Sequence, residues 1–248
     1  ACLRDQRVAG MGIDMRADGM QVVKRGRELY WALVGWMDNE IGKVLRALRE
    51  SDVADNTIVI YTSDHGENKG DHGLWWKNCM YEHGARIPLI VHAPHRWAGG
   101  ERRAGACSLV DLVQTIADLS GAEVPADWDG DSLVPLLDDA EAPWKDEAVS
   151  EYYGHNIASG FAMLRQGRYK YVYHTRMNDA YGPERELYDL AEDPGEWTNL
   201  AERPEEADRV RAMHARLVEV LGREPDDAEA ACRADYARGY GREARKAG

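Results

Sequence analysis

The fold is decided by residues 57–91, which read TIVIYTSDHGENKGDHGLWWKNCMYEHGARIPLIV. Thr57–Tyr61 and Ile87–Val91 are short runs rich in β-branched residues, and such runs predict strands that are covered on both faces. Between them, Ser63–Trp76 is rich in glycine and charge and has no hydrophobic period, which predicts a loop at the C-terminal end of the first strand. Ligand sites concentrate at that end of the strands in open parallel sheets.

The segments on either side of this stretch carry helical patterns. Apolar residues recur at steps of three or four from Arg25 to Glu50, which predicts a helix with a stripe that faces a core. Leu109–Leu119 predicts a second helix, which Gly121 ends. A helix that leads directly into a buried strand favours an α/β layer.

The C-terminal part of the chain has a different pattern. Between Pro135 and Ala148 the sequence becomes rich in aspartate and loses its periodicity, which predicts a domain boundary. After it we expect a small antiparallel sheet with a hairpin turn at Gln166-Gly167, and then a helix that Pro204 opens. The two expected domains are residues 1–145 and 146–248. The expected strands of the second domain are Ala148–Tyr153, Phe161–Arg165, Tyr169–His174 and Glu186–Tyr188.

Composition excludes several classes of partner. Acidic residues outnumber basic residues by 44 to 31 and give a formal net charge of -13, so we expect no nucleic-acid partner and no attraction to anionic lipid. No run of 18 apolar residues occurs, which predicts that nothing here spans a membrane. The chain begins without an initiator methionine, so its localisation stays unknown between the cytoplasm and the periplasm or the outside of the cell.

The predicted loop holds the residues that could do chemistry. Asp64 and His65 are adjacent at the end of a strand, where both side chains can reach one divalent cation, and Gly66 lets the backbone turn after them. Further oxygen ligands would favour calcium, with magnesium and manganese as alternatives. Lys77 could then meet an anionic substrate oxygen. A polar turn with a solvated lysine explains the same residues, so the spacing proposes a site and does not establish it.

Several blocks of the chain, in order, resemble the sulfatase family of the alkaline phosphatase superfamily. Residues 57–94 resemble the segment in which a strand delivers an Asp-His or Asp-Asn metal pair, a lysine follows, and Tyr-Glu…Arg-x-Pro enters the next strand. The resemblance runs from about Tyr30 to Leu221. Its other blocks are YWALVGWMDNEIGKVLRAL at residues 30–48, GRYKYVYH at residues 167–174 and ELYDLAEDPGEWTNLAERPEE at residues 186–206.

This resemblance implies a fold, a chemistry and roles for the loop residues. The fold would be α/β, part of an alkaline-phosphatase-like sandwich with a mostly parallel sheet, followed by a small α+β subdomain with an antiparallel sheet and a long helix. Asp64 and His65 match two metal ligands, and Lys77 matches the lysine that contacts the sulfate group. The substrate would be a small anionic sulfate ester, such as a sulfated sugar or an aryl or alkyl sulfate.

The chain departs from the family at the nucleophile. Sulfatases use a formylglycine made from a cysteine or serine in a Cys-x-Pro-x-Arg context. No cysteine here is followed by proline at the second place or arginine at the fourth, so we expect the formylglycine in a missing N-terminal part and no turnover by this chain alone. The cysteines also show no paired zinc spacing. They are Cys2, Cys79, Cys107 and Cys232.

Two other functions stay open. A phosphonate monoester or phosphodiester hydrolase of the same superfamily uses a similar arrangement of ligands and lysine, and a non-catalytic fragment or partner module would need no nucleophile. Missing strands would leave sheet edges unpaired, which predicts self-association. The pair Trp75-Trp76 could form an apolar wall near Lys77 or pack in the interior. His72, and His155 with Asn156, are weaker candidates for residues that line a pocket.

Overall fold

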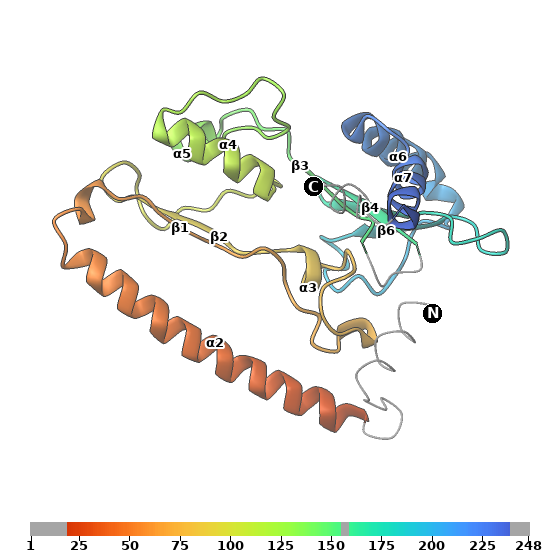
Figure 1. Ribbon diagram of the computed structural model, residues 1–248, viewed down its shortest axis with the longest axis horizontal. Coiled ribbons are helices and arrows are strands. Elements are labelled where there is room, and N and C mark those ends of the chain that lie inside the picture. Colours follow the sequence, from red (N-terminus) through yellow and green to blue (C-terminus); the bar gives the residue numbers. More distant parts are fainter. Residues whose placement is uncertain (1–18, 155–158, 239–248) are drawn as a thin grey trace, which may run out of the picture. The chain divides into compact units, whose positions relative to one another are not determined.

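The computed structural model describes residues 19–154 and 159–238 (Figure 1). The chain forms two compact units, Ala1–Arg102 and Arg103–Gly248. The expected boundary at residue 145 does not coincide with this division, because residues 103–145 group with the C-terminal sheet. Each unit is described by itself.

The first unit consists of one long helix and a two-stranded sheet. Helix α2 is Gly19–Arg49, and Arg46 and Arg49 in its last turn complement the negative end of the helix dipole. Strands β1 and β2 follow, with three short helices near them. The elements after α2 are η1 (Ala54–Asn56), β1 (Val59–Thr62), η2 (Asp71–Gly73), α3 (Glu82–Ala85) and β2 (Leu89–His92).

Strands β1 and β2 pair antiparallel, with Tyr61 opposite Ile90. A parallel pair requires a crossover, usually a long helix, whereas the residues between these strands contain only η2 and the four-residue α3 and turn back on themselves. Both sheets formed by the described residues are antiparallel. Among the strands of residues 19–154 and 159–238, no parallel pair of the expected mostly parallel sheet is present.

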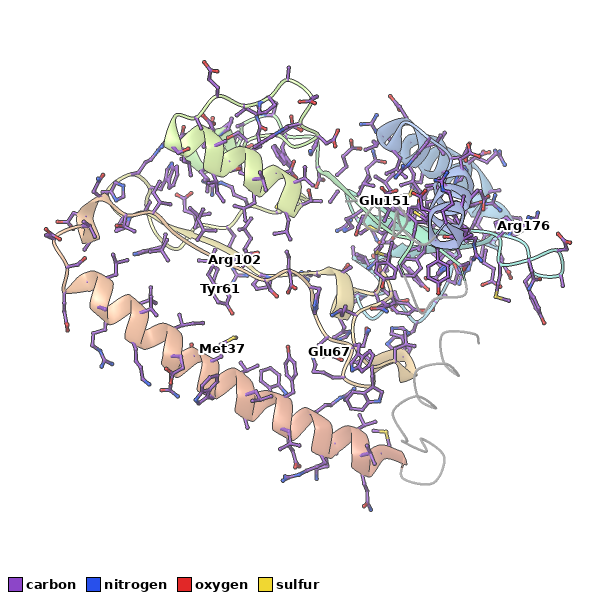
Figure 2. All side chains as sticks on the ribbon, viewed as in Figure 1. Met37, Tyr61, Glu67, Arg102, Glu151 and Arg176 are labelled. Carbon is purple, nitrogen blue, oxygen red and sulfur yellow. The ribbon has the colours of Figure 1, made fainter. Side chains whose placement is uncertain are left out.

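The apolar stripe of α2 does not face a core within the described residues. Leu33 is 64% exposed and Val23 is the buried residue of the helix. Figure 2 shows Met37 of α2 and Tyr61 of β1, and both side chains retain contact with solvent. Ile90 on β2 is also exposed, so the expectation of strands covered on both faces is wrong for these residues. The apolar pattern of α2 shows which face of the helix would pack against another element. No element of the described unit packs on most of that face.

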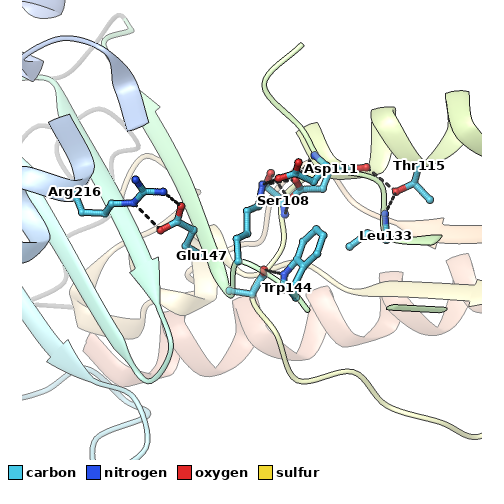
Figure 3. Close-up of polar contacts among 10 residues, drawn as sticks. Ser108, Asp111, Thr115, Leu133, Trp144, Glu147 and Arg216 are labelled. Carbon is cyan, nitrogen blue, oxygen red and sulfur yellow. Dashed lines mark hydrogen bonds and ion pairs between the residues drawn. The ribbon is translucent and has the colours of Figure 1, made fainter. Parts of the chain in front are cut away.

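The second unit begins with helices α4 (Leu109–Ser120) and α5 (Val134–Asp138), and Thr115 Oγ1 of α4 accepts the N–H of Leu133, directly before α5, at 2.8 Å (Figure 3). A buried carboxylate, Asp111, lies in the first turn of α4. Asp111 closes a capping box with Ser108, whose N–H donates to Oδ2 at 2.7 Å. The other oxygen, Oδ1, accepts from Lys145 Nζ at 2.7 Å and from the N–H of Asp131 at 3.0 Å. Trp144 Nε1 donates to the carbonyl of Ala106 at 2.7 Å. These bonds lie within residues 103–145, and the N–H of Ala106 donates to Asp146 Oδ1 at 2.7 Å directly before the next sheet begins.

The predicted antiparallel sheet is confirmed. Its strands pair with their sequence neighbours in the order β3-β4-β5-β6. Gly167 has a φ of 52° in the turn between β4 and β5, where the predicted hairpin lies. The strands are β3 (Glu147–Tyr152), β4 (Phe161–Gln166), β5 (Tyr169–His174) and β6 (Glu184–Asp189).

Helix α6 packs on this sheet and forms the main core. After η3 (Pro204–Glu206), α6 extends over Ala207–Leu221 and buries Val210, Met213 and Leu217 against the strands. Helix α7 (Pro225–Ala237) follows, and Asp226 in its first turn accepts a hydrogen bond from Tyr173 Oη at 2.7 Å. The strand residues of this core are Ala162, Leu164, Tyr171, Tyr173 and Leu187.

A buried ion pair ties β5 to the loop that follows β6. Lys170 and Glu196 form the pair, and both side chains are 1% exposed. Breaking a buried pair by removing one partner leaves the other charge uncompensated and costs far more than breaking a pair at the surface. The pair therefore fixes which loop residue lies beside β5.

We expect the α6–sheet contact to dominate the stability of the second unit. Leu217→Ala removes a side chain that is fully buried, so the free energy of unfolding should fall by about 2–5 kcal/mol. Val220→Ala, on the exposed side of the same helix, should cost less than about 1 kcal/mol. Urea unfolding followed by circular dichroism measures both. Equal losses in the two variants would contradict this packing.

Candidate active site

Asp64 and His65 lie directly after β1, as predicted, and their side chains converge. Asp64 Oδ1 accepts the backbone N–H of His65 at 2.9 Å and the hydroxyl of Ser63 at 3.4 Å. The other oxygen, Oδ2, lies 3.4 Å from His65 Nε2. Desolvation acts to raise the pKa of Asp64, but the hydrogen bond from His65, the proximity of its imidazole and the Ser63 bond together lower it. Asp64 therefore presents a charged oxygen beside an imidazole nitrogen.

The imidazole of His65 is oriented by its second nitrogen. His65 Nδ1 lies 2.8 Å from the carbonyl oxygen of Gly66. A carbonyl can only accept, so this hydrogen bond requires the proton on Nδ1, and in the neutral imidazole the lone pair is then on Nε2. Metal-binding histidines are held in the same way, by an N–H donated to a carbonyl or carboxylate.

The spacing of these two atoms fits two adjacent ligands of one cation. Neighbouring ligands at right angles, each about 2.4 Å from calcium, are about 3.4 Å apart, and Asp64 Oδ2 and His65 Nε2 have that separation. In residues 19–154 and 159–238, no group of three or more His, Cys, Asp or Glu side chains could hold a metal ion. The pair fits a divalent cation as part of its coordination shell.

Gly66 is required by a close approach of two backbone segments. Its N–H donates to the carbonyl of Gly84 at 2.9 Å, and a Cβ built on it would lie 2.1 Å from the carbonyl oxygen of His83. Any side chain there would collide with backbone that cannot rotate away. The end of β1 is thereby held against α3.

Lys77 reaches the same region from the other side of Gly84. A Cβ built on Gly84 would lie 3.4 Å from the carbonyl oxygen of Lys77, while Gly66 binds the carbonyl of Gly84. The side chain of Lys77 is exposed. The structure thus places the carbonyl of Lys77 and the N–H of Gly66, the residue after His65, against one glycine. The chemical roles of Asp64, His65 and Lys77 stay predictions.

The site loop, residues 63–81, is held internally by Glu67 and Asn68. Glu67 Oε1 accepts the backbone N–H of Trp76 at 2.6 Å and that of Lys69 at 3.2 Å. Asn68 is fully buried, and its backbone N–H donates to the carbonyl of Trp76 at 2.9 Å. Its amide nitrogen also donates to Cys79 Sγ at 3.2 Å. These contacts close the loop just before Lys77.

Helix α2 supports the site loop from outside. Arg27 Nε donates to the carbonyl of Lys69 at 2.9 Å, and its Nη2 donates to Asp71 Oδ1 at 2.8 Å. Trp75 lies against Gly26, where a Cβ would be 2.7 Å from the indole, and Gly70 lies as closely against Val23. The first turns of α2 therefore fix the loop in place.

Sequence reasoning missed Arg27, Glu67 and Asn68. Each supports the loop through contacts with backbone atoms, and only Asn68, a polar residue inside a glycine-rich loop, carries a weak signal of a turn. His72 stacks on Tyr81 with ring centroids 3.9 Å apart, which makes it part of the loop's packing. The candidates His155 and Asn156 lie outside the described residues.

Two family models match the chain. The C-terminal model of N-sulphoglucosamine sulphohydrolase matches residues 70–223, and the sulfatase model matches residues 5–122. The chain belongs to the sulfatase family. The resemblance that the sequence blocks indicated is therefore confirmed.

Curated relatives of this sulfatase chain are also sulfatases. Arylsulfatase K of Canis lupus familiaris is 36% identical over 189 residues, which cover 72% of this chain and 34% of the relative. Choline-sulfatase of Rhizobium meliloti (strain 1021) is 35% identical over 185 residues, which cover 73% of this chain and 34% of the relative. The chain thus spans about a third of the length of the curated relatives it matches.

Solved structures share the fold. One, in complex with its substrate D-glucosamine-2-N,6-O-disulfate, has a TM-score of 0.69 and 32% identity over 76% of this chain and 40% of the other. A phosphonate monoester hydrolase of Agrobacterium radiobacter has a TM-score of 0.70 and 28% identity over 79% of this chain and 41% of the other. The predicted α/β class is confirmed. Within the described ranges, no helix has both the length and the apolar character needed to cross a membrane.

The close approach at Gly66 predicts a strong asymmetry between two glycine substitutions. Gly66→Ala places a methyl group on the carbonyl of His83, so the free energy of unfolding of the first unit should fall by about 1–3 kcal/mol. Gly35→Ala, in open space on α2, should raise it by about 0.5–1 kcal/mol. Thermal unfolding of both variants measures the difference. A Gly66→Ala protein as stable as the wild type would show that the two segments are not in contact.

Proposed function

We propose that the protein carrying this chain is a divalent-metal-dependent hydrolase of sulfuric esters, and that Asp64, His65 and Lys77 belong to its active site. The observation that carries the proposal is the 3.4 Å approach of Asp64 Oδ2 to His65 Nε2, with Nδ1 held by the Gly66 carbonyl. Two candidate metal-ligand atoms, Asp64 Oδ2 and His65 Nε2, lie close together in a chain of the sulfatase family. This arrangement supports a metal site better than a polar turn.

Each residue has a separate task in this proposal. Asp64 and His65 hold the cation, which when bound polarises the sulfate oxygens. Lys77 places a positive charge against those oxygens and stabilises the charge that builds on them during the reaction. The nucleophile is a formylglycine that residues outside this chain supply, because none of its cysteines has the required Cys-x-Pro-x-Arg context. The chain alone then has no turnover.

The cation we propose is calcium, with magnesium and manganese as alternatives. The chain supplies one carboxylate and one imidazole, and the remaining ligands come from elsewhere in the protein. Carboxylate and other oxygen ligands suit calcium, magnesium and manganese, and the flexible coordination of calcium places the fewest demands on their geometry.

The proposed metal site can be tested by binding alone. The complete protein, stripped of metal and titrated with CaCl2, MgCl2 and MnCl2 in a calorimeter, should bind at least one ion. Asp64→Ala and His65→Ala should each weaken that binding at least about tenfold, the loss that follows even from removing a hydrogen-bond partner of a ligand. His95→Ala, at an exposed histidine outside the loop, is the control. Unchanged affinity in both loop variants would remove these residues from the metal site.

The proposed substrate is a small organic sulfate ester. The relatives are named for aryl sulfates and for choline sulfate, and a structural neighbour binds a sulfated glucosamine. These names support the sulfate group as the common element and leave the organic group of the substrate open. The proposal therefore rests on the sulfate group, which both Lys77 and the cation would contact.

A phosphonate monoester hydrolase is the second candidate function. It is supported by the Agrobacterium radiobacter enzyme at a TM-score of 0.70 and by another from Silicibacter pomeroyi at 0.62 and 30% identity. A tetrahedral phosphonate monoester, like a sulfate ester, presents anionic oxygens to a cation and a lysine. The two reactions thus call on the same three residues of this chain.

Turnover separates these two functions. We expect the complete protein to hydrolyse 4-nitrophenyl sulfate with a kcat/KM at least about tenfold above that for 4-nitrophenyl phenylphosphonate, and Lys77→Ala to lower kcat of the preferred reaction by about 10²–10³. Lys69→Ala, at a lysine whose ammonium lies over Tyr30, is the control. Preference for the phosphonate would replace the sulfatase proposal with the second candidate. Hydrolysis of neither ester would favour a non-catalytic module.

A further inference from the structure

The structure separates the two adjacent tryptophans of the site loop. Trp75 packs against Gly26 of α2, so its ring belongs to the contact that holds the loop. Trp76 is 51% exposed, although burying an indole stabilises a folded protein more than burying almost any other side chain. The two interpretations of this pair therefore apply to different residues. Trp75 packs against α2, and Trp76 is the one that could form an apolar wall near Lys77.

The backbone at Trp76 is held in an unfavourable conformation. Its φ is 68°, in the left-handed region that costs a residue with a side chain about 1–2 kcal/mol. Glu67 holds its N–H, and Asn68 binds its carbonyl with both its backbone and its side-chain amide (Figure 2 labels Glu67). Such strain persists only where the surroundings impose it, and it clusters at functional sites.

This conformation has a consequence for the residue that follows. Trp76 and Lys77 are both exposed at the point where the loop closes, so an exposed indole directly precedes the proposed sulfate-binding ammonium. An ester held by its sulfate at Lys77 must extend its organic group away from that charge. A flat apolar indole stabilises a ring by stacking on its face.

We propose that Trp76 is a specificity-determining residue that stacks on a ring, aromatic or pyranose, of the organic group of the substrate. The proposal rests on the proposed function for the position of the anion. Glu67 and Asn68 are positioning residues, since they act through the backbone of Trp76.

Uncleavable sulfonates test the stacking independently of turnover. In calorimetric titrations of the complete protein, benzenesulfonate should bind roughly threefold to tenfold more tightly than methanesulfonate, which has the same anion and no ring. Trp76→Gly should abolish this ratio and leave methanesulfonate binding unchanged. This variant removes the indole and also relieves the left-handed backbone, so loss of folding does not confuse the result.

Two further variants sharpen the test. Trp76→Phe keeps an aromatic face and should keep at least half of the ratio, while Trp128→Ala, at an exposed tryptophan outside the loop, should keep all of it. Replacing benzenesulfonate with 6-deoxy-6-sulfo-glucose, an uncleavable pyranose sulfonate, and comparing it with methanesulfonate tells a pyranose from an aromatic ring. A wild-type ratio near one, or a ratio that Trp76→Gly leaves intact, overturns the proposal. The sulfatase proposal fails separately, if the same wild-type protein prefers phosphonate.

Discussion

The candidate site depends on the contact between Gly66 and the segment His83–Gly84. One hydrogen bond of 2.9 Å and the absence of a side chain let two backbone segments touch. Because of that contact, the residues that follow β1 and the residues around Lys77 share one small region although the loop between them is long. The bonds from Glu67 and Asn68 to the backbone of Trp76 close the loop just before Lys77, and the Gly66 contact fixes that closed loop against the end of β1. A backbone contact thus does the positioning, and the polar side chains remain available for ligands.

Much of the fold could be predicted from the sequence because local pattern and tertiary structure agree there. The strands β3–β6 alternate or bury short apolar runs, and Gly167 marks the hairpin between β4 and β5. The direction of β2 relative to β1 could not be predicted, since strand composition is the same for both pairings. The cover of α2 was mispredicted for a related reason, because periodicity identifies an apolar face and not the element that meets it.

The position of the candidate site could be predicted from the sequence, whereas the residues that support it could not. Asp64, His65 and Lys77 are recognisable from residue type and from the sulfatase resemblance, which the family models confirm. Left-handed backbone at a bulky residue such as Trp76 has no sequence signal, since such conformations are imposed by hydrogen bonds formed only in the folded loop. Arg27, Glu67 and Asn68 hold the loop by hydrogen bonds to backbone atoms. Every residue has such atoms, so no sequence motif marks the residues that bind them.

The close packing of Trp75 on Gly26 links the site loop to the N-terminal part of α2. Thirty-one residues of helix extend about 46 Å, yet the loop is attached only to its first turns. Sliding the helix by one turn would carry Gly26 about 5.4 Å away and bring a side chain under the indole, so the helix cannot slide past the loop without breaking this contact. An element that packs on the rest of α2 would therefore act on the site loop through the Gly26–Trp75 contact and the Arg27 hydrogen bonds.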